Sequence, residues 1–219
     1  MSKLPVFPLD VVVFPGMTVP LHAHEERYKR LVREVLAQGD EPKRFIIVYS
    51  DAAPAITDVA PRVARYGTVV HVLSAEENVD GTFDLLVHGQ ERTRVEVDTV
   101  VEVTERGGSS RPLGYAEERP APLYRGDPNE EAVAAWDALD TFRTYAGTRF
   151  DGDAGEEIDK HVPDDPFYQA SFVCANILVP TAAKQTLLEA ESLRERFDLA
   201  RGMMLERMQR RGRTKRGRA

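Results

Sequence analysis

The sequence has a single cysteine and no long apolar run, and each scarcity excludes a class of protein. Cys174 has no partner within the chain, so an internal disulfide cannot form and a reducing compartment is expected. No stretch of about 18 apolar residues occurs, so no segment is predicted to span a membrane. Met1-Ser2-Lys3 leads directly into proline-broken strand sequence instead of an apolar signal core. A cytoplasmic location is therefore predicted.

Motifs for nucleotide and peptide-bond chemistry are also missing. The chain has no G-x-x-x-x-G-K-[ST] phosphate loop, so no candidate for holding ATP exists. No serine lies in a sharp turn between glycines, because Gly107-Gly108-Ser109-Ser110 is typical of a flexible connection. We therefore predict no catalytic residue and no cofactor. The length of 219 residues suits one large domain or two small ones that share a core.

The net charge of −7 is distributed unevenly along the chain. Residues 210–219 contain six basic groups and no acidic one, so removing these six charges leaves −13 for residues 1–209. An acidic body repels phosphate backbones and is a poor platform for nucleic acid. The basic tail lacks apolar residues and is predicted to be disordered. A solvated tail is favoured over weak contact with RNA or an acidic partner.

The first 38 residues change from a strand pattern to a helix pattern. Leu4–Leu9 is apolar but contains Pro5 and Pro8, which predicts an edge strand or a bulged one. Val11–Phe14 is typical of a strand that is buried on both faces. The apolar period then becomes 3.6, which predicts a helix over Glu25–Gln38.

The middle of the chain returns to strand patterns. The predicted strands are Phe45–Tyr49, Tyr66–Leu73, Thr82–Val87, Arg92–Val97 and Val100–Val103. Asp80-Gly81 is a strong signal for a hairpin turn before the third of them. Arg106–Arg125 is rich in Gly, Ser, Pro and charge and is predicted to be a linker.

Beyond the linker the pattern is helical. Asp127 with Pro128 and Glu130 predicts a helix start, and Asp165 with Pro166 predicts another. Thr181 is predicted to cap a third helix, and Ser192 with Glu195 a fourth. The apolar face of the first helix is predicted to be Ala132, Trp136, Leu139, Phe142 and Ala146. That of the second is predicted to be Phe167, Ala170, Val173, Cys174, Ile177 and Leu178.

The order of motifs resembles the N-terminal substrate-recognition domain of Lon proteases. The matching segments are Phe7-Pro8-Leu9, Val12–Met17, Pro20-Leu21, Glu25–Tyr28, Gly67-Thr68-Val69, Asp80-Gly81, Gly89–Arg92 and Lys184–Glu189 followed by Arg196. The chain departs from the family at a few positions. The family usually has apolar residues at the positions of Ala23 and His24, and often has Pro at the position of Glu26.

The resemblance implies an α+β fold: a small twisted PUA-like β-barrel with a covering helix, followed by a C-terminal helical bundle. The expected domains are 1–105 for the barrel, 106–126 for the linker, 127–209 for the helices and 210–219 for the tail. A full Lon protease continues into an ATPase and a peptidase, whose motifs these residues lack. The expectation is a stand-alone, bacterial-type, non-enzymatic module.

The resemblance also implies that the partner is unfolded or apolar-rich polypeptide, with a protease or chaperone as a further partner. The residues expected to contact it are Phe14, Met17, His22, His24 and Arg27. The alternative, that Phe14 and Met17 fill the end of the barrel, is favoured by the sequence. Two rival functions are an RNA-binding PUA-like protein, disfavoured by the acidic body, and an enzyme, disfavoured because no acid–base or nucleophile pair is visible.

The remaining candidates for chemistry are weak. His22 and His24 have no third ligand at metal-site spacing, so a surface or capping role is favoured. Asp151–Glu156 resembles a calcium loop but has Glu where the turn glycine belongs, so it is predicted to be an acidic loop. Cys174 and Trp136 lie on predicted apolar faces. Both are therefore predicted to be core residues, which argues against a nucleophile and against an aromatic cage.

Overall fold

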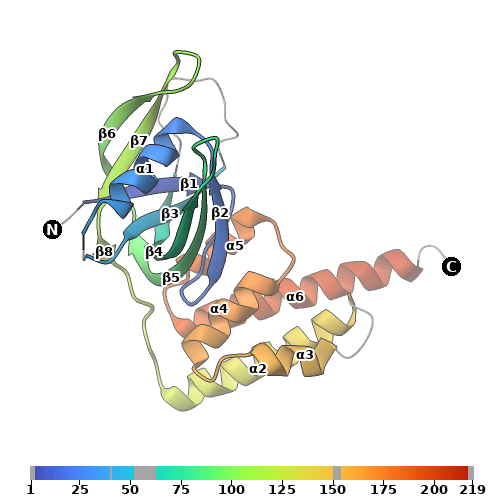
Figure 1. Ribbon diagram of the computed structural model, residues 1–219. Coiled ribbons are helices and arrows are strands. Elements are labelled where there is room, and N and C mark those ends of the chain that lie inside the picture. Colours follow the sequence, from blue (N-terminus) through green and yellow to red (C-terminus); the bar gives the residue numbers. More distant parts are fainter. Residues whose placement is uncertain (1–2, 40, 52–62, 150–153, 217–219) are drawn as a thin grey trace. The chain divides into compact units, whose positions relative to one another are not determined.

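The computed structural model describes residues 3–39, 41–51, 63–149 and 154–216, and the side chains of all of these except 154 and 212–216. The chain divides into two compact units, Met1–Pro122 and Leu123–Ala219. The described residues form one eight-stranded sheet and six helices, so the predicted α+β class is confirmed (Figure 1). Of the predicted loop Asp151–Glu156, residues 151–153 lie outside the described residues, and the prediction is wrong for 154–156, which begin a helix.

The first unit contains the whole sheet and one helix. Its elements are β1 Lys3–Leu9, β2 Thr18–Ala23, α1 Glu26–Leu36, β3 Arg44–Ser50, β4 Val63–Glu77, β5 Phe83–Arg94, β6 Val97–Thr104, β7 Ser110–Glu117 and β8 Arg119–Pro120. The strand order is β2-β5-β4-β3-β1-β7-β6, and β8 pairs with β5 outside this path. Among the described residues no ladder joins β2 to β6, so the predicted barrel remains a prediction.

The prediction that Leu4–Leu9 is an edge strand is wrong, because β1 lies between β3 and β7. Each neighbour pairs with only half of the strand. The antiparallel ladder with β7 covers Lys3–Val6, and the parallel ladder with β3 covers Val6–Leu9. Pro5 therefore lies outside the β3 ladder and Pro8 outside the β7 ladder. Each proline can direct its missing N–H to the side where no strand is paired.

Val11–Phe14 is buried as predicted from Val12 onward, but it is not a strand. The backbone is instead held by single contacts, such as the hydroxyl of Thr68, which donates to the carbonyl oxygen of Val13 at 2.6 Å. The strand buried on both faces is β3, in which Phe45 and Ile47 face one cluster while Ile46 and Val48 face another. An apolar run can thus mark burial without marking strand pairing.

The predicted linker Arg106–Arg125 is wrong for Ser110–Glu117, which form β7. This strand pairs with β1 on one side and β6 on the other. Leu113 and Ala116 are its buried residues, whereas Pro112 and Gly114 obscure the strand signal in the sequence. Gly114 is required by packing, since a Cβ there would lie 2.9 Å from Cγ1 of Val97.

Helix α1 covers one side of the sheet unit. Leu31, Val32 and Val35 form its buried stripe, and they pack with apolar residues of the sheet in the largest core cluster. The helix contacts β2, β6 and β7. Burying each Leu or Val side chain stabilises the fold by about 1.5–3 kcal/mol, so this stripe fixes the helix on the sheet.

The second unit is helical. It contains α2 Pro128–Gly147, α3 Ala154–His161, α4 Pro166–Asn176, α5 Thr181–Glu189 and α6 Leu193–Arg216. The predicted caps are confirmed at Asp127, which accepts hydrogen bonds from two backbone amides, and at Asp165. At the start of α6 the amide of Glu195 donates to the hydroxyl of Ser192 as expected, whereas the carboxylate of Glu195 accepts from the amide of Glu191. Thr181 is the first helical residue instead of the cap.

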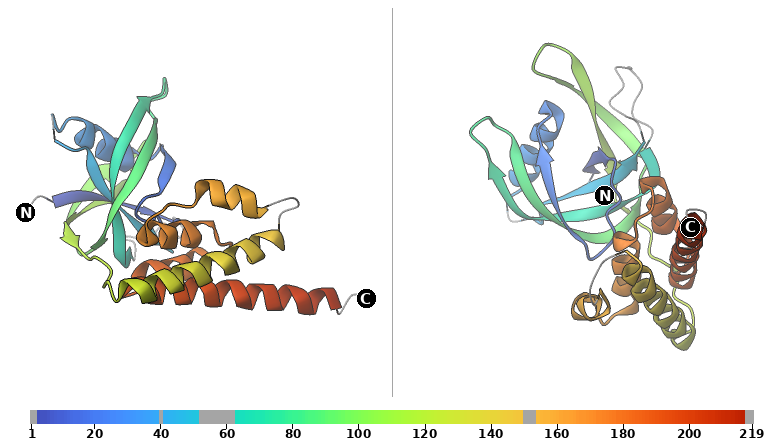
Figure 2. Two further views of the ribbon diagram at one scale, coloured as in Figure 1. Left: turned by 90° about the horizontal axis from the view of Figure 1, so that it is seen from below. Right: turned by 90° about the vertical axis from the view of Figure 1, so that its right-hand side faces the viewer.

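Three predictions about the helical part are wrong. Trp136 is 64% exposed and Ala132 is also exposed, because α2 buries Ala134, Ala135 and Ala138 instead. Small side chains let α2 approach α6 closely, and the two helices lie side by side in both views of Figure 2. Leu178 is exposed beyond the end of α4. The residues predicted to be a disordered tail continue α6 as far as Arg216.

Helices α2 and α6 run in the same direction. Arg194 pairs with Glu130 at their starts, and Arg211 donates to the carbonyl oxygen of Thr148 near their ends. The guanidinium of Arg196 is fully buried and donates to the carbonyl oxygens of Leu187 and Leu188 at the end of α5. None of the described helices is long and apolar enough to cross a membrane.

Candidate functional site

The outer face of β2, β5 and β4 carries an exposed row of apolar side chains. Pro20 of β2 is paired with Leu86 of β5, which faces a bulge made by Leu73 and Ser74 of β4. Leu73 is 53% exposed and Leu86 is 37% exposed. We call Pro20, Leu86 and Leu73 the apolar band. Cross-strand neighbours share one face of a sheet, so the band is continuous across three strands.

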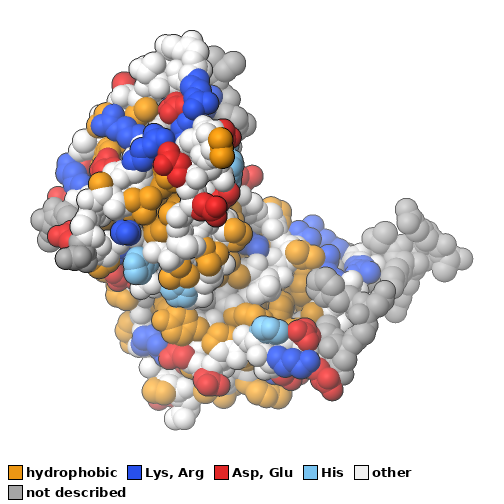
Figure 3. Space-filling view, in the orientation of Figure 1, with side chains coloured by type: hydrophobic (Ala, Val, Ile, Leu, Met, Phe, Trp, Pro, Cys, Tyr) orange, Lys and Arg blue, Asp and Glu red, His pale blue; other side chains and the backbone are white. Residues whose placement is uncertain are grey.

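A row of imidazoles lies beside the apolar band. Thr18, His88 and His71 are paired in register across β2, β5 and β4, and the hydroxyl of Thr18 lies 3.1 Å from Nδ1 of His88. His71 and Leu73 also line a surface hollow of about 530 Å³, together with Val72, Gly39, Glu41, Pro42 and Lys43. Figure 3 shows histidine side chains among apolar ones on the visible face of the sheet unit.

The opposite side of the apolar band is acidic. His22, Asp84 and Glu76 are paired across the same three strands, and Nδ1 of His22 lies 2.7 Å from the Asp84 carboxylate. The side chain of Asn78 also donates to Asp84 at 2.9 Å. These hydrogen bonds, first that of Asn78 and then that of His22, lower the pKa of Asp84. The band therefore has the imidazoles of His88 and His71 on one side, and the carboxylates of Asp84 and Glu76 with His22 on the other.

Two of the predicted contact residues, Phe14 and Met17, form an interlocked turn. The amide of Phe14 donates to the sulfur of Met17 at 3.1 Å, and the amide of Met17 donates to the carbonyl oxygen of Phe14 at 3.1 Å. Phe14 has no exposed surface, and Met17 packs partly against the main core cluster. Phe14 is therefore buried, as the alternative expects, whereas its place at the end of a barrel stays a prediction. Its side chain offers no surface to a polypeptide in this structure.

The turn also depends on two glycines. Gly16 has a φ of 87°, a left-handed conformation that glycine adopts without strain. A Cβ on Gly89 would lie 2.6 Å from the carbonyl oxygen of Phe14. In the sequence, Gly89 stands out only as the first residue of the motif Gly89–Arg92, and that motif alone does not predict the close contact with Phe14.

His22 and His24 are both exposed, and their ring centroids are 6.0 Å apart in a stacked arrangement. His22 belongs to the row beside the apolar band, and His24 follows β2 directly. No group of three or more His, Cys, Asp or Glu side chains in the described ranges could hold a metal ion. The pair is therefore a feature of the surface that borders the band.

Arg27 lies apart from the band and ties α1 to β7. Its guanidinium pairs with Glu25 at 3.0 Å, donates to the carbonyl oxygen of Pro112 and stacks over Tyr28 with 4.4 Å to the ring centroid. Glu25 also pairs with Arg111 at 3.0 Å. These contacts hold the helix entry to the sheet, which is a structural role.

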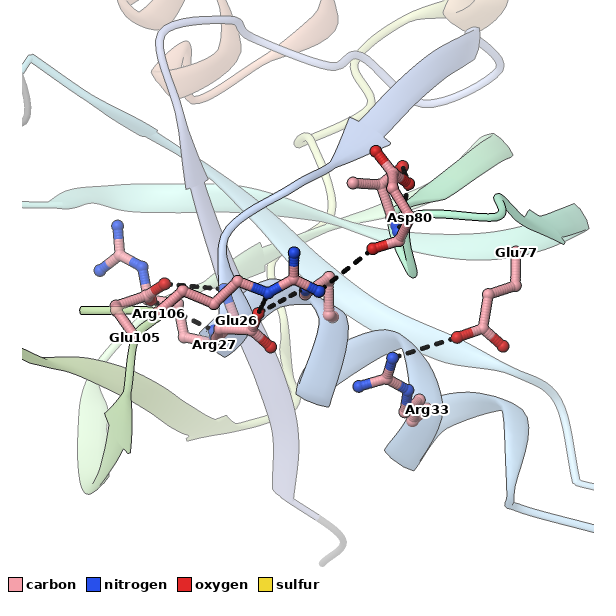
Figure 4. Close-up of polar contacts among 9 residues, drawn as sticks. Glu26, Arg27, Arg33, Glu77, Asp80, Glu105 and Arg106 are labelled. Carbon is pink, nitrogen blue, oxygen red and sulfur yellow. Dashed lines mark hydrogen bonds and ion pairs between the residues drawn. The ribbon is translucent and has the colours of Figure 1, made fainter. Parts of the chain in front are cut away.

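A polar network surrounds the first turn of α1 (Figure 4). The carboxylate of Glu105 accepts from the amides of Glu26 at 2.9 Å and Arg27 at 3.4 Å, and so caps the helix. Glu26 pairs with the buried Lys29 at 2.6 Å and with Arg106 at 2.9 Å. The hydrogen bond from Lys29 is the main reason why the pKa of Glu26 is lowered.

The second unit has no arrangement suited to nucleophilic catalysis at its cysteine. Cys174 is fully buried, and this burial raises the pKa of its thiol to about 12. At neutral pH it is therefore a thiol and not a thiolate, as expected for a core residue. Trp136 and Val133 are exposed on α2, so Trp136 is not the core residue that the sequence predicts and its burial does not exclude an aromatic site on this surface.

Comparisons with known proteins agree on one family. The model of the ATP-dependent protease La (LON) substrate-binding domain matches residues 3–206. The Lon protease of Xanthomonas oryzae is 31% identical over 204 residues, which cover 92% of this chain and 22% of that protein. The Lon protease of Escherichia coli K12 is 27% identical over 214 residues, 92% of this chain and 24% of that protein. The chain thus spans about a quarter of the length of these relatives.

Solved structures show the same fold. The N-terminal domain of Lon protease from the Mycobacterium avium complex has a TM-score of 0.66 and 20% identity, and covers 93% of this chain and 98% of that one. A Lon N-terminal domain protein from Xanthomonas campestris has a TM-score of 0.54 and 21% identity, with 90% and 96% covered.

Proposed function

Because the chain belongs to the family of Lon protease substrate-binding domains, we propose that it binds unfolded, apolar-rich polypeptide and catalyses no reaction itself. The family model that matches describes a substrate-binding domain, and this match is our basis for proposing polypeptide as the class of ligand. The apolar band is the surface at which we propose that the polypeptide binds, because its apolar side chains are exposed on three adjacent strands.

The apolar band suits a disordered apolar segment better than a small molecule. Pro20, Leu86 and Leu73 form an open strip and not an enclosed cavity, and the hollow at His71 extends the strip at the β4 end. Apolar side chains of a bound segment would lose water against this strip, and each buried CH₂ contributes about 0.8 kcal/mol. The flanking rows of imidazoles and carboxylates bound the strip on both sides and limit the width of what binds.

The predicted contact residues divide between the band and its support. His22 and His24 border the band and remain in the proposed contact surface. Met17 is half-buried and contributes through its exposed part, whereas Phe14 and Arg27 hold the turn and the helix in place. The relatives are named Lon protease, so we propose that a protease is the partner that receives the bound polypeptide.

The test is a titration of a denatured, fluorescently labelled model protein with the full chain. Replacing Leu73 and Leu86 together by Lys should weaken binding by tenfold or more, because the charges prevent apolar contact on the band. Val79→Lys is the control: Val79 is fully exposed at the tip of the β4–β5 hairpin, so a lysine there should leave binding unchanged. Circular dichroism checks that each variant keeps its fold.

Salt dependence separates polypeptide binding from nucleic-acid binding. Burial of apolar surface is not screened, so the affinity for polypeptide should change little between low and moderate salt. RNA binding would weaken steeply, because each neutralised phosphate releases counterions. Tight, salt-sensitive binding of single-stranded RNA by residues 1–209, without polypeptide binding, would overturn the proposal.

A further inference from the structure

The two end strands of the sheet each leave a row of backbone groups without a described partner. In the described part of the chain β2 pairs only with β5, and β6 pairs only with β7. An unpaired row of N–H and C=O groups is a template on which an extended chain can add as another strand. The two ends differ in how complete this template is.

The template of β2 is interrupted. The amide of Gly89 donates to the carbonyl oxygen of Met17, and in an antiparallel ladder every second residue bonds to the same neighbour. The residues of β2 that face away from β5 are therefore Thr18, Pro20 and His22. Pro20 has no N–H, so the central donor of this edge is missing. Such a proline protects an edge from strand addition.

The template of β6 is complete. The amide of Glu105 donates to the carbonyl oxygen of Ser109 at 2.7 Å, and this sets the parity of the β6–β7 ladder. The residues of β6 that face away from β7 are Val100, Glu102 and Thr104. None is proline, so three N–H and three C=O groups in succession have no backbone partner among the described residues. The register shift of this ladder lies earlier, between Val97 and Thr99.

The side chains of β6 also favour an added strand. Val100 is 48% exposed, although it lies in the middle of an edge strand. On the other face Val103 is buried and Val101 is half-buried, so an added strand would extend an apolar surface there. Asp98 is paired with Lys3, whereas Glu102 has no ion pair among the described residues. A basic or neutral residue of the added strand would complement Glu102.

Building on the proposed function, we propose that the edge of β6 from Val100 to Thr104 binds an extended segment of the unfolded polypeptide as an additional strand. The segment has no proline over about five residues, because its own N–H groups must complete the ladder. It has an apolar residue beside Val100 and a neutral or basic residue beside Glu102. Main-chain hydrogen bonds at this edge supply affinity that does not depend on a specific sequence.

The test compares two substitutions of one residue in the full chain. Glu102→Pro removes the central outward N–H and leaves the β7 ladder intact, because the amide of Glu102 does not face β7. It should weaken binding of a denatured, labelled model protein by tenfold or more. Glu102→Ala removes the same side chain but keeps the N–H, so it should stay within about threefold of the wild type.

Amide hydrogen exchange of the wild-type chain provides a measurement that needs no variant. The amides of Val100, Glu102 and Thr104 should exchange rapidly in the free protein and slow on addition of the denatured protein. Those of Val101 and Val103 should already be slow, because β7 protects them. Equal binding by both variants, or no slowing at the three outward amides, overturns strand addition while polypeptide binding itself persists. Absence of any polypeptide binding by the wild type overturns the proposed function as well.

Discussion

Phe14 is fixed by its own turn, and its side chain is removed from water completely. Truncating a fully buried Phe removes apolar contacts and leaves a cavity. Phe14→Ala should therefore lower the free energy of unfolding by about 3–5 kcal/mol, measured by urea denaturation. Leu73→Ala, at a half-exposed position of the apolar band, is the control and should cost less than about 1 kcal/mol. Equal losses for the two variants would contradict the burial of Phe14.

Gly89 tests the close approach between β5 and the same turn. A Cβ at this position would lie 2.6 Å from a backbone oxygen of Phe14, which cannot move aside as a flexible side chain can. Gly89→Ala should destabilise the chain by about 1–3 kcal/mol, the usual cost of overpacking. Gly126→Ala, where a Cβ would meet nothing within 4 Å, is the matched control and should be neutral or slightly stabilising.

At the scale of elements, helix α1 is capped from a distant part of the chain. Glu105, which follows β6, accepts hydrogen bonds from the first amides of the helix 79 residues earlier. Glu105→Ala should cost about 0.5–2 kcal/mol, as expected for loss of a helix cap. Glu105→Gln keeps an acceptor oxygen and should cost less. Thermal unfolding of the two variants measures the difference, and identical midpoints would contradict the capping role.

Glu26 gives this helix entry a defined pH dependence. Its pKa is lowered from an ordinary value of 4.5, first by the hydrogen bond from Lys29. A lowered folded-state pKa means that the stabilisation is present above 4.5 and is lost as the pH falls through the folded value. Glu26→Gln should therefore reduce the fall in melting temperature between neutral pH and about pH 3. An unchanged pH profile would show that the Glu26–Lys29 pair does not stabilise the fold.

The elements also show how far sequence reasoning reaches. The helix at Glu26–Leu36, the Asp80-Gly81 hairpin and the caps at Asp127 and Asp165 follow from local chemistry, and all were predicted. Strand β7 and the central place of β1 were not, because both depend on which strands meet. A proline in a strand shows that one ladder hydrogen bond is missing at that position. Only the strand register shows that a neighbouring strand pairs with the other side of β1 there.

The face of a helix is harder to predict when alanine is abundant. Leu139, Phe142 and Ala146 of the predicted face of α2 are buried, but the large side chain of Trp136 is exposed and three alanines, Ala134, Ala135 and Ala138, share the buried stripe. Close helix approach makes small residues good core residues, so size alone misassigns the face. The same reasoning applies to the candidate site. His22 and His24 were found as surface residues, whereas Leu73 and Leu86 join the apolar band only through the β4–β5 register.

At the scale of the whole molecule, the boundary between the two compact units lies within a linker that the sequence predicts only as the broad range Arg106–Arg125. The first compact unit ends at Pro122, inside the predicted linker, since β7 and β8 belong to the sheet. The segment after β7 is bound to the end of β5. The amide of Ala121 donates to the carbonyl oxygen of Arg92, and Nε of Arg92 donates to the carbonyl oxygen of Ala121 at 2.6 Å. The segment that leads out of the sheet unit is therefore hydrogen-bonded to the sheet as far as Ala121.

This continuity predicts where the first unit can be cut. A fragment of residues 1–122 keeps both carbonyl oxygens, of Ala121 and Pro122, that accept from the buried guanidinium of Arg92. It should fold and unfold cooperatively in urea. A fragment of residues 1–118 loses these acceptors and β8, and should be less stable by at least about 1–3 kcal/mol, because a buried charged group loses hydrogen bonds. Arg92→Ala in the 1–122 fragment removes the guanidinium but keeps β8, so its stability measures the loss of these hydrogen bonds without the loss of β8. Equal midpoints for the two fragments would show that residues 119–122 are a passive connection and that the sheet unit ends with β7.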